Sequence, residues 1–210
     1  MLPPITLIDY GIGNLHSVEK ALETVGATVH RTDKPTDILN ADKLVLPGVG
    51  AFGACMQALE TRELITPIRE AIRQGTPLLG ICVGLQLLFE YSEEQGIHQG
   101  LGYMPGKIVH FPEALTTQKG LKIPHMGWNT LDIHQQHPLF EGLPTAPYFY
   151  FVHSYIAQPA QKEHVLATTH YGTHFPAVVG YKQVLGVQFH PEKSHTNGLT
   201  LLKNFIRWNP

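Results

Sequence analysis

A predicted strand-to-helix corner at Cys82 constrains the fold more than any other part of the sequence. The apolar run 76–81 predicts a buried strand, and residues 83–90 predict the start of a helix. Gly80 and Gly84 flank the corner, and small residues at these positions allow the sharp turn that lifts a nucleophile out of a sheet. A helix N-terminus also favours the reactive thiolate. A buried structural cysteine is the alternative, but it explains neither glycine.

A second motif supplies partners for the thiol. Residues 184–189 are rich in β-branched and aromatic side chains and predict another strand. His190 and Glu192 follow it two positions apart, so an extended backbone, which Pro191 favours, places both side chains on one side. The carboxylate can then orient the imidazole while its other nitrogen faces the sulfur of Cys82. The sequence therefore predicts a Cys-His-Glu catalytic triad.

Strand-like and helix-like segments alternate through the first half of the chain. The predicted elements are strands at 5–9, 28–30, 43–46 and 76–81 and helices at 15–25 and 65–74. Asn14 is the predicted N-cap of the first helix, and Gly26 and Gly75 end the two helices. This alternation is typical of a parallel sheet covered by helices on both faces.

The second half has a different pattern. Residues from about 106 to 189 are dense in β-branched and aromatic residues, Pro and Gly, which predicts an antiparallel or mixed extension of the sheet. Residues 199–206 predict a closing helix. We expect one α/β domain over residues 1–210, without linkers or repeats.

Composition limits the function classes. The chain has 210 residues, 43% of them hydrophobic, and a net charge of −2, which favours an ordinary globular protein over a nucleic-acid-binding one. It contains no run of eighteen apolar residues, and its first six residues do not resemble a secretory signal. Two cysteines cannot form a disulfide framework. We expect a cytoplasmic protein without membrane or nucleic-acid partners.

Two cofactor hypotheses are weak. The thirteen histidines include pairs with ligand-like spacing at 134/137 and 170/174, but both pairs lie in predicted loops or strand ends without a Cys pair or a His-Glu-x-x-His helix. The opening Gly11 and Gly13 follow a strand as in a dinucleotide fingerprint, yet His16 occupies the position of its third small residue. We therefore expect no metal and no nucleotide cofactor.

The two catalytic motifs together resemble those of class I, or triad, glutamine amidotransferases. Further blocks are similar to the glutaminase subunits of imidazole glycerol phosphate synthases, which serve histidine biosynthesis, and the resemblance runs nearly end to end. These blocks are residues 8–15, 47–53, 124–129, 150–155 and 190–194. The resemblance implies a flavodoxin-like α/β fold with a central, mostly parallel sheet.

The resemblance also implies the reaction, hydrolysis of glutamine to glutamate and ammonia without a cofactor. Cys82 is expected to form a thioester with the substrate, His190 to transfer protons and Glu192 to orient His190. The oxyanion is expected to bind the N–H of Val83 and the 47–50 loop, at Val49 or Gly50. The implied glutamine-binding residues are Gly50, Gln86, Glu94, Ser154 and Tyr155.

A partner is implied as well. The expected complex is a heterodimer with a (β/α)₈-barrel cyclase, which receives ammonia through an internal channel and makes imidazole glycerol phosphate and AICAR. Candidate interface residues are Gly13, Asn14, Trp128, Tyr150 and Lys193. An exposed aromatic residue suits such an interface, whereas a buried Trp128 would be a core residue. His125 and His153 fall within the shared blocks and are candidates to line the cleft.

Other functions share some of these motifs. A stand-alone cysteine hydrolase would keep the Cys82 corner but has no need of the opening glycine block, and a non-catalytic binding module has no need of an intact triad. Amidation of a surface sugar, instead of histidine synthesis, is a further alternative that uses the same glutaminase chemistry.

Overall fold

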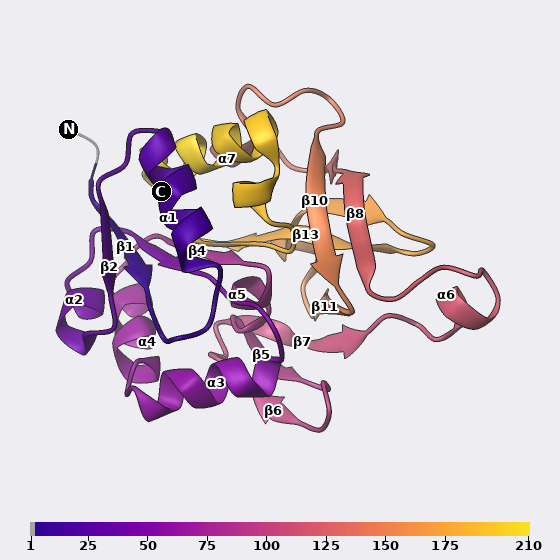
Figure 1. The fold of residues 1–210 in the computed structure, drawn as a ribbon, viewed down its shortest axis with the longest axis horizontal. Coiled ribbons are helices and arrows are strands. Elements are labelled where there is room, and N and C mark those ends of the chain that lie inside the picture. Colours follow the sequence, from indigo (N-terminus) through magenta and orange to yellow (C-terminus); the bar gives the residue numbers. More distant parts are fainter. Residues whose placement is uncertain (1–2) are drawn as a thin grey trace.

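The computed structural model describes residues 3–210 and contains a central eight-stranded sheet, shown in Figure 1. The strand order is β2-β1-β3-β4-β14-β13-β12-β9, and the first five strands are parallel. The parallel strands are β1 (Ile5–Ile8), β2 (Val29–Thr32), β3 (Leu44–Leu46), β4 (Leu78–Ile81) and β14 (Val184–Val187). The antiparallel strands are β13 (His174–Tyr181), β12 (Val165–His170) and β9 (Asp132–Ile133).

Helices cover both faces of the parallel strands. Helices α1 and α7 pack together on one face, and α2, α3 and α4 cover the other (Figure 1). Their bounds are α1 (Leu15–Thr24), α2 (Pro35–Leu39), α3 (Phe52–Thr61), α4 (Ile65–Arg73) and α7 (His195–Arg207). Every residue of β1, β3, β4 and β14 is buried, as expected for parallel strands covered on both faces. The predicted mostly parallel α/β fold is confirmed.

The second half adds two smaller sheets. One has the order β11-β7-β5-β6, and the other is an antiparallel ribbon of β10 and β8. Their strands are β5 (Phe89–Ser92), β6 (His98–Gln99), β7 (Met104–His110), β8 (His125–Thr130), β10 (Tyr148–His153) and β11 (Tyr155–Pro159). The short elements are α5 (Val83–Gln86), α6 (Ala114–Thr117), η1 (Pro138–Phe140), η2 (Lys162–His164) and η3 (Pro191–Lys193). The predicted antiparallel or mixed extension is therefore present.

The local predictions were met in part. The helix predicted over 83–90 ends at Gln86, because tertiary hydrogen bonds to the carbonyls of Leu87 and Leu88 turn the chain into β5. Asn14 is the N-cap residue of α1, as predicted, but its side chain makes no capping hydrogen bond. Helices α2 and α3 were not predicted, since their apolar residues are too few to give a clear period.

Within residues 3–210, no helix is both long enough and apolar enough to cross a bilayer. The expected absence of a secretory signal concerned residues 1–6, and the first two of these lie outside the described range.

A buried lysine ties the last helix to the sheet. Lys43 precedes β3, is 4% exposed, and donates to the carbonyls of Phe205 (2.9 Å), Ile206 (2.7 Å) and Trp208 at the C-terminal end of α7. These carbonyls have no intrahelical donor, and a cation at this end also complements the helix dipole. The ammonium therefore joins segments separated by more than 160 residues in sequence.

Replacing Lys43 with Met keeps the aliphatic stem and removes all three hydrogen bonds. We expect Lys43→Met to lower the free energy of unfolding by about 2–3 kcal/mol, since bonds to charged groups contribute more than neutral ones and the carbonyls would stay buried. Urea denaturation measures this value. Lys162→Met at an exposed position is the control, and an equal loss in both variants would contradict the role of Lys43.

Candidate active site

Cys82 lies at the carboxyl end of β4, in the interior of the sheet, with φ 55° and ψ −111°. A positive φ is strained for a residue with a side chain and persists only where its surroundings enforce it. The Cys82 N–H donates to Val187 O (2.8 Å), and a Cβ on Gly84 would lie 1.9 Å from Leu46 O. The predicted sharp corner is therefore present, and it requires glycine at position 84.

The helix after Cys82 is shorter than the sequence predicted, so its dipole stabilises a thiolate less than we expected. Helix α5 has only four residues, and its macrodipole is correspondingly small. The N–H of Val83, the first residue of α5, still has no intrahelical acceptor and can therefore donate to an anion.

His190 and Glu192 form the predicted pair, but through a different backbone. Residues 191–193 make a 3₁₀ turn instead of the extended segment expected, and the bond from Lys193 N to His190 O closes it. His190 Nδ1 lies 2.8 Å from Glu192 Oε1, and both side chains are almost fully buried. His190 Nε2 is also buried and has no hydrogen-bond partner among the described residues, so it is free to exchange a proton with the substrate site.

The surroundings of His190 favour its charged form. Burial alone lowers the pKa of His190, but the neighbouring Cys82 and Glu192 outweigh burial and raise this pKa to about 10. Bonding to the charged form and an adjacent negative charge both act in this direction. An imidazolium beside Cys82 suits a cysteine that reacts as a thiolate.

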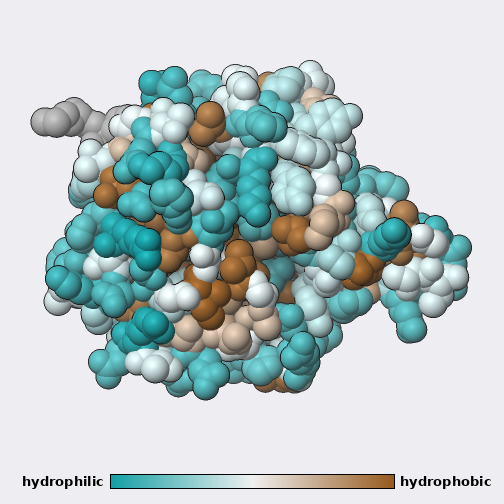
Figure 2. Space-filling view, in the orientation of Figure 1, coloured by the Kyte–Doolittle hydropathy of each residue, from teal (hydrophilic) through white to brown (hydrophobic). Residues whose placement is uncertain are grey.

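A cavity of about 330 Å³ brings the predicted residues together. It contains Cys82 and His190, the three proposed oxyanion residues and all of the proposed glutamine-binding residues. Its lining is Val49, Gly50, Cys82, Val83, Gln86, Glu94, Pro124, Val152, His153, Ser154, Tyr155 and His190. Figure 2 shows hydrophobic residues gathered in the middle of this face of the molecule, between α1 and α3.

A larger hollow lies elsewhere. An open groove of about 1110 Å³ follows α3, α4 and the β5–β6 turn, and shares Glu94 with the cavity. Neither Cys82 nor His190 lines this groove, so the smaller cavity is the candidate active site. Within it, Glu94 Oε2 accepts a hydrogen bond from Phe52 N (2.7 Å) and is thereby fixed beside the pocket.

The loop after β3 is held from beneath by two buried side chains. Tyr10 Oη donates to Pro47 O (2.8 Å), and Cys55 Sγ donates to Val49 O (3.4 Å). Because the Val49 carbonyl points toward Cys55 of α3, the N–H of Gly50 across the same planar peptide points the opposite way. Gly50 has φ +82°, which favours glycine at this position.

One residue that contacts the nucleophile was missed in the sequence. Gln188 is fully buried, and its Nε2 lies 3.9 Å from Cys82 Sγ, while its Oε1 accepts from Gln86 Nε2 (3.2 Å). A polar residue inside an otherwise apolar strand and directly before Phe189-His190 was the available signal.

Two buried histidines lie on the wall of the site. His153 Nε2 and His125 Nδ1 are 3.0 Å apart, within an aromatic cluster that includes Phe111 and Phe151. Burial lowers the pKa of His125 to about 4 and that of His153 to about 3. Both are therefore neutral at pH 7, in contrast to His190.

The histidine pairs considered for metal binding have other contacts. His134 Nε2 meets Thr168 Oγ1 (2.8 Å), and His137 Nδ1 accepts from Leu139 N (3.0 Å). His170 and His174 are cross-strand neighbours in the β12–β13 hairpin. Residues 3–210 contain no group of three or more His, Cys, Asp or Glu side chains placed to hold a metal ion.

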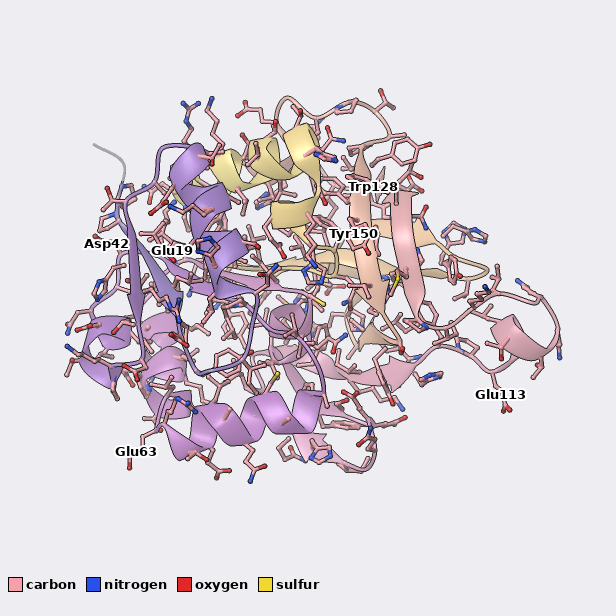
Figure 3. All side chains as sticks on the ribbon, viewed as in Figure 1. Glu19, Asp42, Glu63, Glu113, Trp128 and Tyr150 are labelled. Carbon is pink, nitrogen blue, oxygen red and sulfur yellow. The ribbon has the colours of Figure 1, made fainter. Side chains whose placement is uncertain are left out.

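The outer face of the β8–β10 ribbon is aromatic and exposed. Trp128 is 46% exposed, which excludes the core alternative, and its ring lies 6.0 Å from that of Tyr150 (Figure 3). Lys193 Nζ lies 6.0 Å from the Tyr150 ring, and Met126 and Tyr148 add further exposed apolar area. This ribbon face adjoins the active-site cavity through Val152.

The remaining interface candidates stand at the head of α1. Gly13, with φ +141°, lies against Pro47, and Asn14 precedes Leu15. Helix α1 packs against the η3 turn that carries Lys193, and β10 contacts the same turn.

Comparison with known proteins gives the family. The family model described as glutamine amidotransferase class-I matches residues 6–208. The chain belongs to the class I glutamine amidotransferase family. It is 56% identical over 204 residues to the imidazole glycerol phosphate synthase subunit HisH of Salinibacter ruber, covering 95% of this chain and 92% of that protein. The HisH subunit of Syntrophotalea carbinolica is 51% identical over 202 residues, covering 96% and 98%.

Solved structures of more distant proteins share the fold. A crystal structure of a glutamine amidotransferase has a TM-score of 0.74 at 19% identity and covers 96% of this chain and 97% of its own. The structure of PurLQS from Thermotoga maritima has a TM-score of 0.75 at 18% identity and covers 99% of each chain. At these identities the solved structures support only the fold assignment. The HisH subunits, at 56% and 51% identity, indicate which members of the family this chain resembles.

The neutral histidines predict a pH dependence of stability. An unfolded histidine has a pKa of about 6.5. Because the folded values for His125 and His153 lie below it, the unfolded state binds more protons as the pH falls from 7.5 toward 5, and stability decreases. We expect His125→Gln to reduce this acid loss by on the order of 2 kcal/mol, because one such titration disappears.

Urea denaturation at the two pH values tests this expectation. The contribution of His190 to the pH dependence of stability has the opposite sign, since its raised pKa gives stability that is present below pH 6.5 and lost as the pH rises toward 10. This contribution is the same in the wild type and in His125→Gln, so it does not affect their difference. His16→Gln, at an exposed position, is the control. An acid loss in His125→Gln that equals that of the wild type would show that folded His125 takes up a proton between pH 7.5 and 5 as readily as an unfolded histidine does.

Proposed function

We propose that this chain is the glutaminase subunit of an imidazole glycerol phosphate synthase and supplies ammonia for histidine biosynthesis. The observation that carries the proposal is one cavity lined by the thiol of Cys82, the imidazole of His190 and residues Val49 and Gly50 of the loop after β3, in a chain about half identical to HisH subunits over nearly its full length. The expected location is the cytoplasm, and the expected organisation is a single domain over residues 1–210.

The reaction begins with the thiolate. Cys82 Sγ attacks the side-chain amide carbon of glutamine, and the carbonyl becomes an oxyanion in a tetrahedral intermediate. The N–H of Val83 and the N–H groups of Val49 or Gly50 are the proposed donors to this oxyanion. His190, charged and oriented by Glu192, gives its proton to the amide nitrogen as the C–N bond breaks. Ammonia departs, the oxyanion becomes a carbonyl again, and the acyl group stays on Cys82 as a thioester.

Hydrolysis completes the cycle. The now neutral His190 Nε2 takes a proton from water, which attacks the thioester carbon, and glutamate leaves as the thiol or thiolate returns. Gln86, Glu94, Ser154 and Tyr155 line the same cavity and are the proposed contacts for the amino-acid part of the substrate. Glu94 supplies the negative charge that an α-ammonium group requires.

The exposed aromatic ribbon is the proposed docking surface for a cyclase subunit with a (β/α)₈ barrel. Trp128, Tyr150 and Lys193 form one contiguous cluster, and large aromatic side chains dominate binding energy at interfaces. Gly13 and Asn14 would contact the same partner from the head of α1. Because the cavity opens beside this ribbon, a bound subunit could receive ammonia through an internal channel before it reaches water.

Replacing Cys82 with Ala separates the two half-reactions. We expect Cys82→Ala to lose glutamine-dependent synthesis by the assembled complex but to retain ammonia-dependent synthesis, because the second reaction needs only the partner's site. The rate of imidazole glycerol phosphate formation with glutamine or with ammonium salts measures both. Glutamine hydrolysis by Cys82→Ala at a rate near that of the wild type would contradict the assignment of Cys82 as the nucleophile.

The other two triad residues should differ in their effect. His190→Asn removes the proton carrier and is expected to lower kcat by at least about 10³-fold, whereas Glu192→Gln keeps a partner for Nδ1 and should cost less, because the orienting acid of a triad contributes less than the nucleophile or the base. Steady-state glutaminase assays with the partner bound give both values. Equal activity of Glu192→Gln and the wild type at every pH would remove Glu192 from the mechanism.

The docking surface can be tested without catalysis. We expect Trp128→Ala to weaken binding to the cyclase subunit by at least about 30-fold, as is typical of an aromatic hot spot. Isothermal titration calorimetry with the purified partner measures the Kd. Ile97→Ala is the matched control, since Ile97 is 65% exposed but lies beside α3 and away from the ribbon. Similar losses in the two variants would place the interface elsewhere.

A further inference from the structure

A buried hydrogen-bond chain connects the nucleophile to strand β8. It runs from Cys82 Sγ through Gln188, Gln86, the Tyr155 carbonyl, His153 and His125 to Asn129, with links of 3.9, 3.2, 3.3, 2.9, 3.0 and 3.3 Å. The side chains of Gln86, Gln188, His125 and His153 are all buried. A buried polar chain of this length is costly unless every member is satisfied, so its directions can be worked out.

The Tyr155 carbonyl fixes the direction of the chain toward the sulfur. A carbonyl oxygen can only accept, so Gln86 must present its NH₂ group to it. The same NH₂ group faces Gln188, which must therefore present its oxygen. The NH₂ group of Gln188 is then left facing Cys82 Sγ. No rotation of either amide satisfies these contacts in another way.

The same carbonyl fixes the other direction. His153 Nδ1 must carry the hydrogen that Tyr155 O accepts, so the Nε2 of neutral His153 is an acceptor and His125 Nδ1 is its donor. His125 Nε2 then accepts from Asn129 Nδ2. The Asn129 orientation is set independently, because its Oδ1 accepts from Thr130 N (2.9 Å) and its Nδ2 donates to His170 O (2.9 Å). The hydrogen-bond directions set by the Tyr155 carbonyl and by Asn129 therefore agree.

We infer that Gln188 is a further residue of the catalytic site, whose amide N–H holds the sulfur of Cys82 and stabilises its negative charge. A donor aimed at the sulfur favours the thiolate over the thiol. The Val152 carbonyl, 4.0 Å from Sγ, can accept only from the thiol, so Gln188 supplies the opposing preference. Gln86 and the two histidines act through Gln188 and are positioning residues. The inference rests on the proposed role of Cys82 as nucleophile.

This arrangement gives Gln86 a second role. Its NH₂ group is fully used by Tyr155 O and Gln188 Oε1, so it orients Gln188 in addition to lining the substrate cavity. The wall that binds glutamine and the group that stabilises the nucleophile are consequently parts of one hydrogen-bond network.

The test uses the rate at which iodoacetamide alkylates Cys82 at one fixed pH, read from the Cys82 peptide by mass spectrometry. This rate depends on the thiolate and does not require glutamine or the partner. We expect Gln188→Met to lower it about ten-fold, the lower end for a hydrogen bond to a charged group. Gln86→Met should lower it by a smaller factor, because Gln188 is retained but loses its orientation.

A double variant separates a connected chain from two structural effects. Because Gln86 acts through Gln188, the double variant Gln86→Met/Gln188→Met should be no slower than Gln188→Met alone, whereas unrelated damage would multiply. Gln135→Met is the control, since it likewise removes two amide–carbonyl bonds, one exposed and one part-buried, near β9 at the far end of the central sheet. It should alkylate like the wild type.

The outcomes are distinct. Alkylation of Gln188→Met within about two-fold of Gln135→Met, or multiplicative loss in the double variant, would overturn the inference. Should Gln188→Met not fold, as judged by its melting temperature, an unchanged rate in Gln86→Met would overturn it as well. Failure of the wild type to hydrolyse glutamine with its partner would instead contradict the proposed function, and would leave the alkylation result to decide the role of Gln188.

Discussion

The close approach of α5 to the end of β3 is the constraint on which the rest of the structure depends. Only a glycine at position 84 can pass the Leu46 carbonyl, and the turn beside this contact holds Cys82 at positive φ. Because β3, β4 and β14 are adjacent parallel strands, their carboxyl ends place the 47–50 loop, Cys82 and His190 at one edge. The strain at a single corner therefore determines where the chemistry takes place.

The site also joins the two halves of the fold. The first half contributes the thiol and the loop after β3, and the second half contributes His190, Glu192 and the wall formed by His153, Ser154 and Tyr155. The Tyr155 carbonyl accepts from both halves, through Gln86 and His153. One backbone oxygen thus sets the direction of the polar network on either side, which explains how a largely buried set of amides and imidazoles is tolerated.

The buried histidines near the site have pKa values shifted in opposite directions, and the presence or absence of a neighbouring charge decides the direction. His125 and His153 are buried among aromatic rings without a counter-charge, and desolvation lowers the pKa of each. His190 is equally buried, but Cys82 and Glu192 lie beside it, and its pKa is raised. The first two can therefore hold fixed tautomers in a structural chain, while the third can carry a proton during the reaction.

The sequence by itself determined the α/β class, the triad candidates and most of the cavity, since glycine spacing and strand patterns express local backbone requirements. Only the tertiary structure decided the length of the helix after Cys82, which long-range bonds to Leu87 and Leu88 cut short, and the 3₁₀ turn at Glu192. It also decided the exposure of Trp128 and the contact of Gln188 with the nucleophile. These features depend on which distant segments become neighbours, and local sequence patterns do not show that.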